Sequence, residues 1–209
     1  MSVDTSEGVI KFQLDHEVKT LKAFDVAEIN AWRTVFKQTG TIGQVADRYD
    51  GYGFGNLSQK TTSGFLISGT QTGILESTSI ADYAEVTRWD SRGNSVSSQG
   101  RVSPSSESLT HAVIYEACPE VVAVFHLHSP DIWHAGTELG IPVTSPEILY
   151  GTPQMAEAVN QCVSESPLPG ILSMGGHEDG IIAYGRTLNE TGLLLIRYLV
   201  DARRLLVDD

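Results

Sequence analysis

The chain has 209 residues, of which 41% are hydrophobic and 19% are charged, and its formal net charge is −12. This length suits one compact core, so we expect residues 1–209 to form a single domain. The acidic excess repels nucleic-acid phosphates and argues against a nucleic-acid partner. No apolar run is long enough to span a bilayer, and the polar residues 1–14 do not resemble a secretory signal. We therefore expect a cytoplasmic protein without a membrane segment, in which Cys118 and Cys162 form no disulfide.

The first third of the chain predicts one helix followed by extended segments. Apolar residues recur at helical spacing over residues 24–36, and Gly40 lies just beyond that stretch. The glycines of residues 51–55 could be compared with a nucleotide-binding loop. Such a loop precedes a helix, however, whereas residues 56–68 have the composition of extended chain. We interpret the glycines as a loop that enters a strand.

The remaining elements alternate between strands and helices. Residues 83–89 and 95–102 flank the turn-forming residues 90–94 and predict a hairpin. A helix is predicted to start at Ser105, Ser106 and Glu107 and to end before Pro119. Further elements are predicted in this order: a buried strand over 121–125, a helix over 154–163, a strand ending near His177, a strand over 181–184 and a helix over 190–206. This order predicts an α/β fold.

Two histidines directly follow the buried strand over 121–125. Side chains alternate faces along a strand, so His126 and His128 project from the same side and could reach one metal ion. Alone, the pair could equally be polar residues at a strand end facing water. A catalytic metal site commonly has three protein ligands, and the other histidines are His16, His111, His134 and His177. Spacing alone makes His134 the main competitor of His177, which lies in a glycine-rich segment.

Glu107 has two possible roles that the residues alone do not separate. A carboxylate at a helix start is stabilised by the helix dipole, by a few tenths to about 1 kcal/mol. The same carboxylate could act as an acid or base beside a metal ion.

Five motifs occur in an order and at intervals that together are far more specific than any one of them. They are Gly55-Asn56-Leu57-Ser58, Thr70-Gln71-Thr72-Gly73, Pro104-Ser105-Ser106-Glu107, His126-Leu127-His128 and the late, glycine-flanked His177. In these motifs the chain resembles the class II aldolase and adducin-head family over nearly its whole length. The resemblance implies a three-layer α/β/α fold with a central, largely antiparallel sheet.

The resemblance also implies a site and a reaction. The histidines that match His126, His128 and His177 bind zinc in the family's sugar-phosphate aldolases, and the glutamate that matches Glu107 carries a proton. Manganese, iron or cobalt would also suit three histidines. The phosphate cradle would comprise Gly55, Asn56, Thr72, Gly73, Ser105 and Ser106. The implied substrate is a small, phosphorylated ketose, cleaved through a metal-stabilised enediolate. A homotetramer is implied as well.

Two departures and several alternatives accompany the resemblance. The family usually has glycine directly after its third histidine, whereas Glu178 and Asp179 intervene here. The segment between His128 and the next helix is short, so the family's substrate-contacting tyrosine has no evident equivalent. The same site could serve an epimerase, a decarboxylase or a sugar-phosphate dehydratase of the methylthioribulose-phosphate type. A non-enzymatic, adducin-head-like binding module would have no need of the histidines and Glu107 together.

Overall fold

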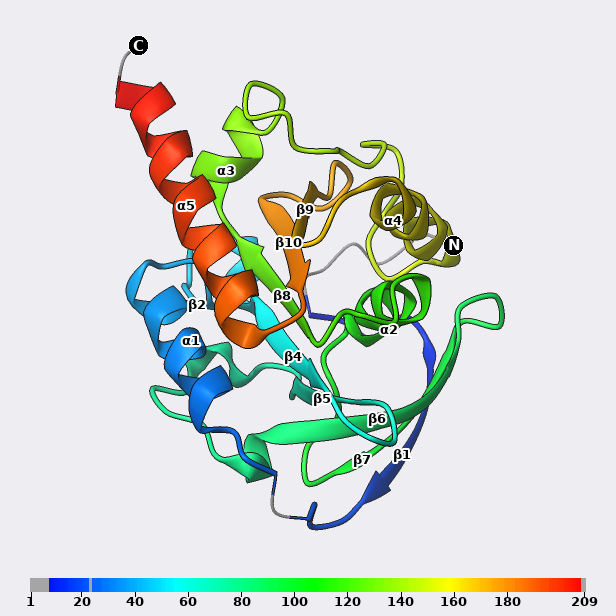
Figure 1. Ribbon diagram of the computed structural model, residues 1–209. Coiled ribbons are helices and arrows are strands. Elements are labelled where there is room, and N and C mark those ends of the chain that lie inside the picture. The colour runs from blue at the N-terminus through cyan, green and yellow to red at the C-terminus, as the bar shows by residue number, and fades with distance from the viewer. Residues whose placement is uncertain (1–7, 23, 208–209) are drawn as a thin grey trace.

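The computed structural model describes residues 8–22 and 24–207, which form a layered α/β structure (Figure 1). Its large sheet has eight strands in the order β1-β7-β6-β5-β4-β8-β10-β9. Every neighbouring pair is antiparallel except β1 and β7, which are parallel. The strands are β1 (Gln13–Val18), β4 (Asn56–Lys60), β5 (Phe65–Ser68), β6 (Tyr83–Asp90), β7 (Ser95–Gly100), β8 (Ala123–His128), β9 (Gly170–Ser173) and β10 (Gly180–Gly185). A separate short pair consists of β2 (Gly43–Gln44) and β3 (Gly53–Phe54).

Helices cover both faces of the large sheet (Figure 1). One face carries α1 (Ala27–Gln38), α3 (Pro130–Ala135) and α5 (Leu188–Val207). The other carries α2 (Ser108–Ala117) and α4 (Pro153–Glu165), which pack against each other. No helix of the described residues is long and apolar enough to cross a membrane.

Each face of the sheet buries its own apolar core. On the α2 and α4 side, Val124, Leu172 and Ile182 join residues of both helices. On the α1 and α5 side, Phe125, Leu127 and Ile181 pack under the helices. Successive strand residues therefore feed opposite cores, as the period of two requires. Burial on both faces explains why these strands read as continuous apolar runs.

The expected three-layer α/β fold with a largely antiparallel sheet is confirmed, with local differences. The extended stretch over residues 56–68 is two strands, β4 and β5, joined by a turn. The predicted start of α2 was three residues too early, because Ser105 and Ser106 precede the helix and Glu107 is its N-cap. The elements that had not been predicted include the short pair β2 and β3, the edge strand β1 and the short helix α3, whose N-cap Ser129 accepts a hydrogen bond from the Ile132 amide.

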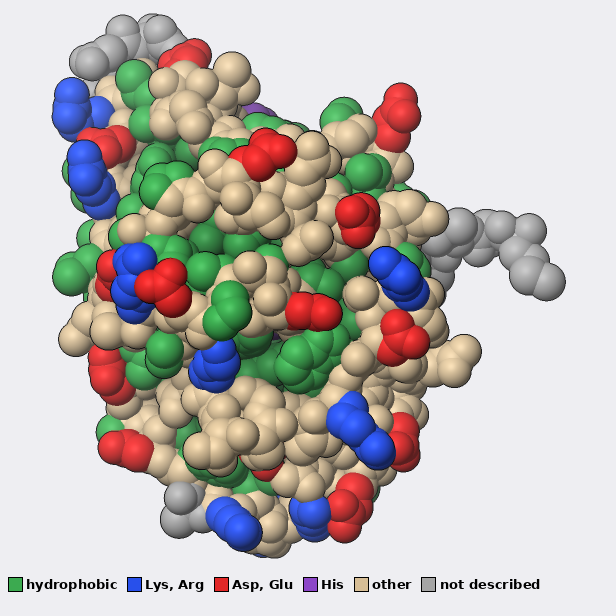
Figure 2. All heavy atoms as spheres, turned by 45° about the vertical axis from the view of Figure 1, so that its right-hand side comes forward, with side chains coloured by type: hydrophobic (Ala, Val, Ile, Leu, Met, Phe, Trp, Pro, Cys, Tyr) green, Lys and Arg blue, Asp and Glu red, His purple; other side chains and the backbone are tan. Residues whose placement is uncertain are grey.

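The surface carries charged groups of both signs. Figure 2 shows Lys and Arg side chains interspersed with Asp and Glu side chains, and apolar side chains gathered in a hollow near the middle of that face. No broad basic stripe crosses this face, which agrees with the formal net charge of −12.

Candidate metal centre and active site

Three histidines from two strand ends meet inside the protein. His126 and His128 occupy alternate positions of β8, so their rings share the α2 side of the sheet. His177 lies in the loop between β9 and β10. The Nε2 atoms of His126 and His128 are 3.1 Å apart, and those of His128 and His177 are 2.9 Å apart. One ligating atom from each residue lies within 4.8 Å of the others. The predicted third partner of the pair is therefore in place.

This arrangement fits a divalent cation. Nitrogens bound tetrahedrally to one ion at roughly 2.0–2.1 Å lie roughly 3.3 Å apart, close to the spacings found here. The Nδ1 of His126 lies 3.2 Å from the Ile181 carbonyl and donates to it, which directs the Nε2 lone pair into the cluster. Burial lowers the pKa of His126 to about 4 and those of His128 and His177 well below the usual value. The imidazoles are therefore neutral at pH 7, the form that binds a metal.

Glu107 lies beside this cluster. Its side chain is fully buried, and Oε1 is 3.9 Å from Nδ1 of His177. Burial raises the pKa of Glu107 to about 7, while Thr110 and the charge of Lys11 offset part of that shift. The position as N-cap of α2 comes from a local turn, in which the Glu107 amide donates to Ser105 Oγ and the Ser108 amide donates to the Ser105 carbonyl. The carboxylate is thus held at a helix start and directed toward the histidines.

All six residues predicted to form an anion cradle line one small polar cavity. They are Gly55, Asn56, Thr72, Gly73, Ser105 and Ser106, and the cavity is completed by neighbours that include Gly53 and Gln71. Asn56 is the cross-strand partner of His126, which places the cradle next to the histidine cluster. The buried Oδ1 of Asn56 has no hydrogen-bond partner among the described residues. A buried polar atom of this kind is suited to a ligand.

Two glycines of the cradle are required by geometry. Gly55 has φ of +76°, a left-handed conformation that side chains disfavour. A Cβ on Gly73 would lie 2.2 Å from the Gly43 carbonyl oxygen, closer than any contact permits. From α1, Arg33 donates to the Thr72 carbonyl at 2.7 Å, and Lys37 donates to the Gly73 carbonyl at 3.1 Å. These bonds fix the turn next to the cavity and add positive charge behind it.

A polar network supports the cluster from the side of β3. The ring of Tyr49 packs edge-on against that of His128, with centroids 4.5 Å apart. Its hydroxyl donates to Asp179 Oδ2 at 2.5 Å and accepts from Arg48 at 2.6 Å. Asp179, in turn, accepts from the Ser129 amide through its own carbonyl. Asp179 is one of the two residues that depart from the family pattern, and in the structure it joins Tyr49 to the loop of His177. The sequence showed the departure but did not indicate this contact.

A second set of residues borders the cluster on the side of His177. The ring of Tyr150 packs edge-on against that of His177, with centroids 4.6 Å apart. Lys11 Nζ lies 3.5 Å from the centroid of the Tyr150 ring. A cavity of about 150 Å³ is lined by these three residues together with Tyr49, Asp50, Leu149, Gly176 and Glu178. Tyr150 lies in the segment after His128, where the sequence offered no evident equivalent of the family's substrate-contacting tyrosine, and no pattern pointed to Tyr49 or Lys11.

The other histidines lie elsewhere. His134 is exposed on α3 and packs against Trp133, so it is not part of the cluster. His16 Nδ1 is hydrogen-bonded to Ser98 on the neighbouring strand β7. His111 is buried on α2, where Ser58 Oγ links it to Tyr115. The structure therefore selects His177 over His134 as the neighbour of His126 and His128.

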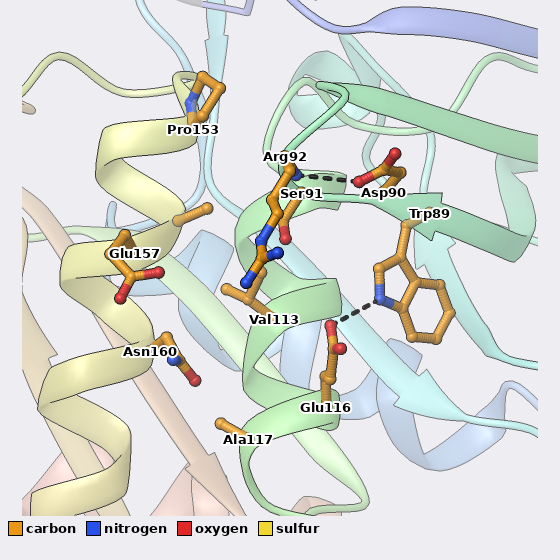
Figure 3. A pocket seen from close by; sticks show the side chains of 11 residues that line it. Trp89, Asp90, Ser91, Arg92, Val113, Glu116, Ala117, Pro153, Glu157 and Asn160 are labelled. Atoms are coloured by element: carbon orange, nitrogen blue, oxygen red, sulfur yellow. Dashed lines mark hydrogen bonds between the residues drawn. The ribbon is translucent and has the colours of Figure 1, made fainter.

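A larger cavity of about 460 Å³ lies apart from the histidines, between α2, α4 and the turn after β6 (Figure 3). Trp89 Nε1 donates to Glu116 at 3.3 Å on its wall. Glu116 is nine residues from Glu107 on α2, which corresponds to roughly 14 Å along a helix. The cavity contains no member of the histidine cluster or the cradle, so it is not the candidate active site.

Sequence comparison assigns the chain to a family. Residues 45–198 match the profile of the class II aldolase and adducin N-terminal domain, and the protein belongs to that family. A 5-methylthioribulose-1-phosphate/5-deoxyribulose-1-phosphate aldolase of Escherichia coli is 32% identical over 154 residues. That match covers 66% of this chain and 66% of the relative, slightly less than two thirds of each.

Solved structures confirm the fold. L-fuculose-1-phosphate aldolase from Thermus thermophilus superimposes with a TM-score of 0.68 at 20% identity, covering 87% of this chain and 92% of that one. YgbL from Escherichia coli, described as a putative aldolase/epimerase/decarboxylase, gives a TM-score of 0.64 at 18% identity, with coverages of 86% and 87%. At these identities the likeness shows the shared class II aldolase-like architecture.

Proposed function

We propose that the protein is a metal-dependent lyase that makes or breaks a carbon–carbon bond in a small phosphorylated ketose. The observation that carries this proposal is the buried cluster of His126, His128 and His177 with Glu107 3.9 Å from His177. The cradle adjoins the same site through Asn56. Membership of the aldolase family and the names of its relatives support the same reaction class.

The three histidines would hold one divalent ion, most suitably Zn²⁺, with Mn²⁺, Fe²⁺ or Co²⁺ as alternatives for this donor set. When bound, the ion would polarise a ketose carbonyl and the adjacent hydroxyl and stabilise enediolate charge. Glu107 is buried next to the histidines and would carry the proton that the substrate carbon gains or loses. Exclusion of water by the buried site would strengthen each of these electrostatic interactions.

The cradle would bind the substrate phosphate. Its six residues, Gly55, Asn56, Thr72, Gly73, Ser105 and Ser106, supply backbone amides and small polar side chains suited to enclosing an anion. Arg33 and Lys37 reinforce it by holding the carbonyls of the Thr72 turn. Phosphate binding there would fix the sugar carbons relative to Glu107, so that only small ketose phosphates are placed for reaction.

The proposal also covers the domain organisation, the location and the oligomeric state of the protein. We expect residues 1–209 to act as one domain in a cytoplasmic homotetramer with sites near subunit boundaries, which light scattering would test. A dehydratase or epimerase of the same fold is the second candidate, because one fold can serve several reactions; the name of one structural relative includes an epimerase beside an aldolase. An adducin-head-like binding role is less compatible with a fully buried histidine cluster and Glu107.

Product analysis tests the reaction class. The metal-loaded protein would be incubated with phosphorylated and free ketoses, and products would be identified by mass spectrometry. Release of dihydroxyacetone phosphate and an aldehyde from a ketose 1-phosphate is the expected result. Loss of water without loss of carbon would instead identify a dehydratase. No turnover of any ketose by protein with a full complement of metal would contradict the proposal.

A further inference from the structure

Lys11 places a positive charge at the candidate active site from outside the family domain. The family profile covers residues 45–198, whereas Lys11 belongs to the segment that leads into β1. Its side chain lines the 150 Å³ cavity with His177, Tyr49 and Tyr150. No inference from the family pattern therefore applies to this lysine, and its role must be argued from its surroundings.

The segment holds Lys11 firmly in position. The adjacent Phe12 is buried in the core under α2 and α4. The Lys11 carbonyl accepts from Asn94 Nδ2 at 3.0 Å. The lysine stem packs over Gly151, where an added Cβ would lie 3.2 Å from Lys11 Cδ. The ammonium donates to the Tyr150 carbonyl at 3.3 Å and lies 3.5 Å from the Tyr150 ring centroid.

Lys11 shares a cavity with His177 and acts electrostatically on two groups of the site. Burial is the main cause of the pKa shifts of Glu107 and His177, and the charge of Lys11 lowers the pKa of both. The ammonium lies over the Tyr150 ring, and that ring packs nearly perpendicular to the His177 ring, so Lys11 and His177 border the same cavity. An ammonium in a partly buried cavity is a strong donor to a substrate oxygen.

The cavity and the cradle share no lining residue, and each has a lining residue next to Glu107. Ser105 and Ser106 line the cradle and directly precede Glu107 in the sequence, and His177, which lines the cavity, has its Nδ1 atom 3.9 Å from Glu107 Oε1. A substrate whose phosphate occupies the cradle and whose carbonyl lies at the histidines would extend its remaining carbons into the cavity. The oxygen substituents of those carbons would then meet Lys11.

We propose that Lys11 is a substrate-contacting residue that selects ketose phosphates of more than three carbons by donating to an oxygen beyond the metal-binding pair. This inference rests on the proposed function. The donor would serve a hydroxyl of the intact ketose and the oxygen that becomes an aldehyde on cleavage. Asp50 and Glu178 line the same cavity and disfavour a carboxylate there, so the contact is assigned to a neutral sugar oxygen.

Two ligands of different length distinguish a contact between Lys11 and the substrate from a general effect of Lys11 on the site. Dihydroxyacetone phosphate would reach only the cradle and the histidines, whereas ribulose 1-phosphate would also reach Lys11. Calorimetry would use zinc-loaded protein carrying Glu107→Gln, so that the ligand is not consumed. In that background Lys11→Met should weaken ribulose 1-phosphate binding by about tenfold or more. Binding of dihydroxyacetone phosphate and of inorganic phosphate should change less than about twofold, and zinc content should be unchanged.

Matched variants complete the design. Lys11→Arg keeps the charge and should retain most of the selectivity, while Lys11→Gln tests the charge if the Met variant folds poorly. Lys19→Met serves as the control, because Lys19 is an exposed lysine just after β1, paired with Glu17. Equal weakening of both sugar phosphates, loss of zinc, or unchanged ribulose 1-phosphate binding in Lys11→Met would each overturn the proposal. Failure of the parent protein to bind either sugar phosphate would overturn the proposed function itself, and this inference with it.

Discussion

The hydroxyl of Tyr49 donates a 2.5 Å hydrogen bond to Asp179, which joins two loops that are 130 residues apart in sequence. Tyr49 follows Arg48 in a segment with two consecutive left-handed residues, Tyr49 at φ 49° and Asp50 at φ 55°. Non-glycine residues rarely adopt this conformation, which costs of the order of 1–3 kcal/mol per residue. The bond to Asp179 holds that strained segment against His128 and next to the loop that carries His177.

Disrupting this bond is expected to weaken metal binding. Asp179→Asn removes the charge that faces Arg48, and Tyr49→Phe removes the donor. Outer groups that orient metal ligands commonly affect affinity by roughly 10–100-fold. Competition with a fluorescent zinc chelator should show a loss of that order in either variant. Asp131→Asn, which disrupts an exposed ion pair with Arg203, is the control. Unchanged zinc affinity in both test variants would show that the hydrogen bond between Tyr49 and Asp179 stabilises the loop conformation without affecting metal binding.

The third ligand can be tested by comparing two histidines. His177→Ala should lower zinc affinity by several orders of magnitude, because a catalytic site retains three protein ligands. His134→Ala should leave it unchanged, since His134 is exposed on α3. The chelator competition used for Asp179 measures both. The reverse ranking would show that the loop of His177 adopts another position when metal is bound.

Glu107 is expected to act in chemistry rather than in metal retention. Glu107→Gln keeps the shape of the side chain but removes the group that exchanges a proton. Turnover should fall by roughly a hundredfold or more, while zinc content and the melting temperature stay near those of the unaltered protein. Loss of zinc would identify Glu107 as a ligand, and full activity would place the proton carrier elsewhere.

The cradle makes a separate prediction through Asn56. Asn56→Asp introduces a negative charge at a buried position that lines the cavity and faces His126 across the strands. Binding of inorganic phosphate and of ketose phosphates should weaken by about tenfold or more because like charges repel. Asn160→Asp, in the larger cavity of Figure 3, is the control and should bind phosphate normally. Equal phosphate affinity in both variants would place the anion site outside the cradle.

Much of the site could be predicted from local patterns because they report local geometry. His126 and His128 share a face through strand periodicity alone, and His177 was distinguished from His134 only by the family's motif order. The three histidines, Glu107 and the cradle residues do meet, although their catalytic roles stay predictions. Motif order succeeded because it carries information on long-range contacts that spacing lacks.

The parts that sequence reasoning missed depend on packing between distant segments. Lys11 and Tyr150 meet across 139 residues, and no periodicity reports such a contact. The edge strand β1 has an alternating but mostly exposed pattern, so it lacks the apolar content that predicts a strand. Asp179 was recognised as a departure, but its partner Tyr49 lies in a glycine-rich loop that reads as a plain connection. Such contacts become visible only when the sheet order is known.

Metal stoichiometry tests the central claim most directly. Purified protein, reconstituted with zinc and desalted, would be analysed for metal per chain beside a His126→Ala/His128→Ala variant. We predict about one ion per chain in the unaltered protein and almost none in the double variant, with circular dichroism showing both folded. Equal metal content in the two folded proteins, whether zero or one, would contradict the assignment of this buried histidine cluster as a metal centre.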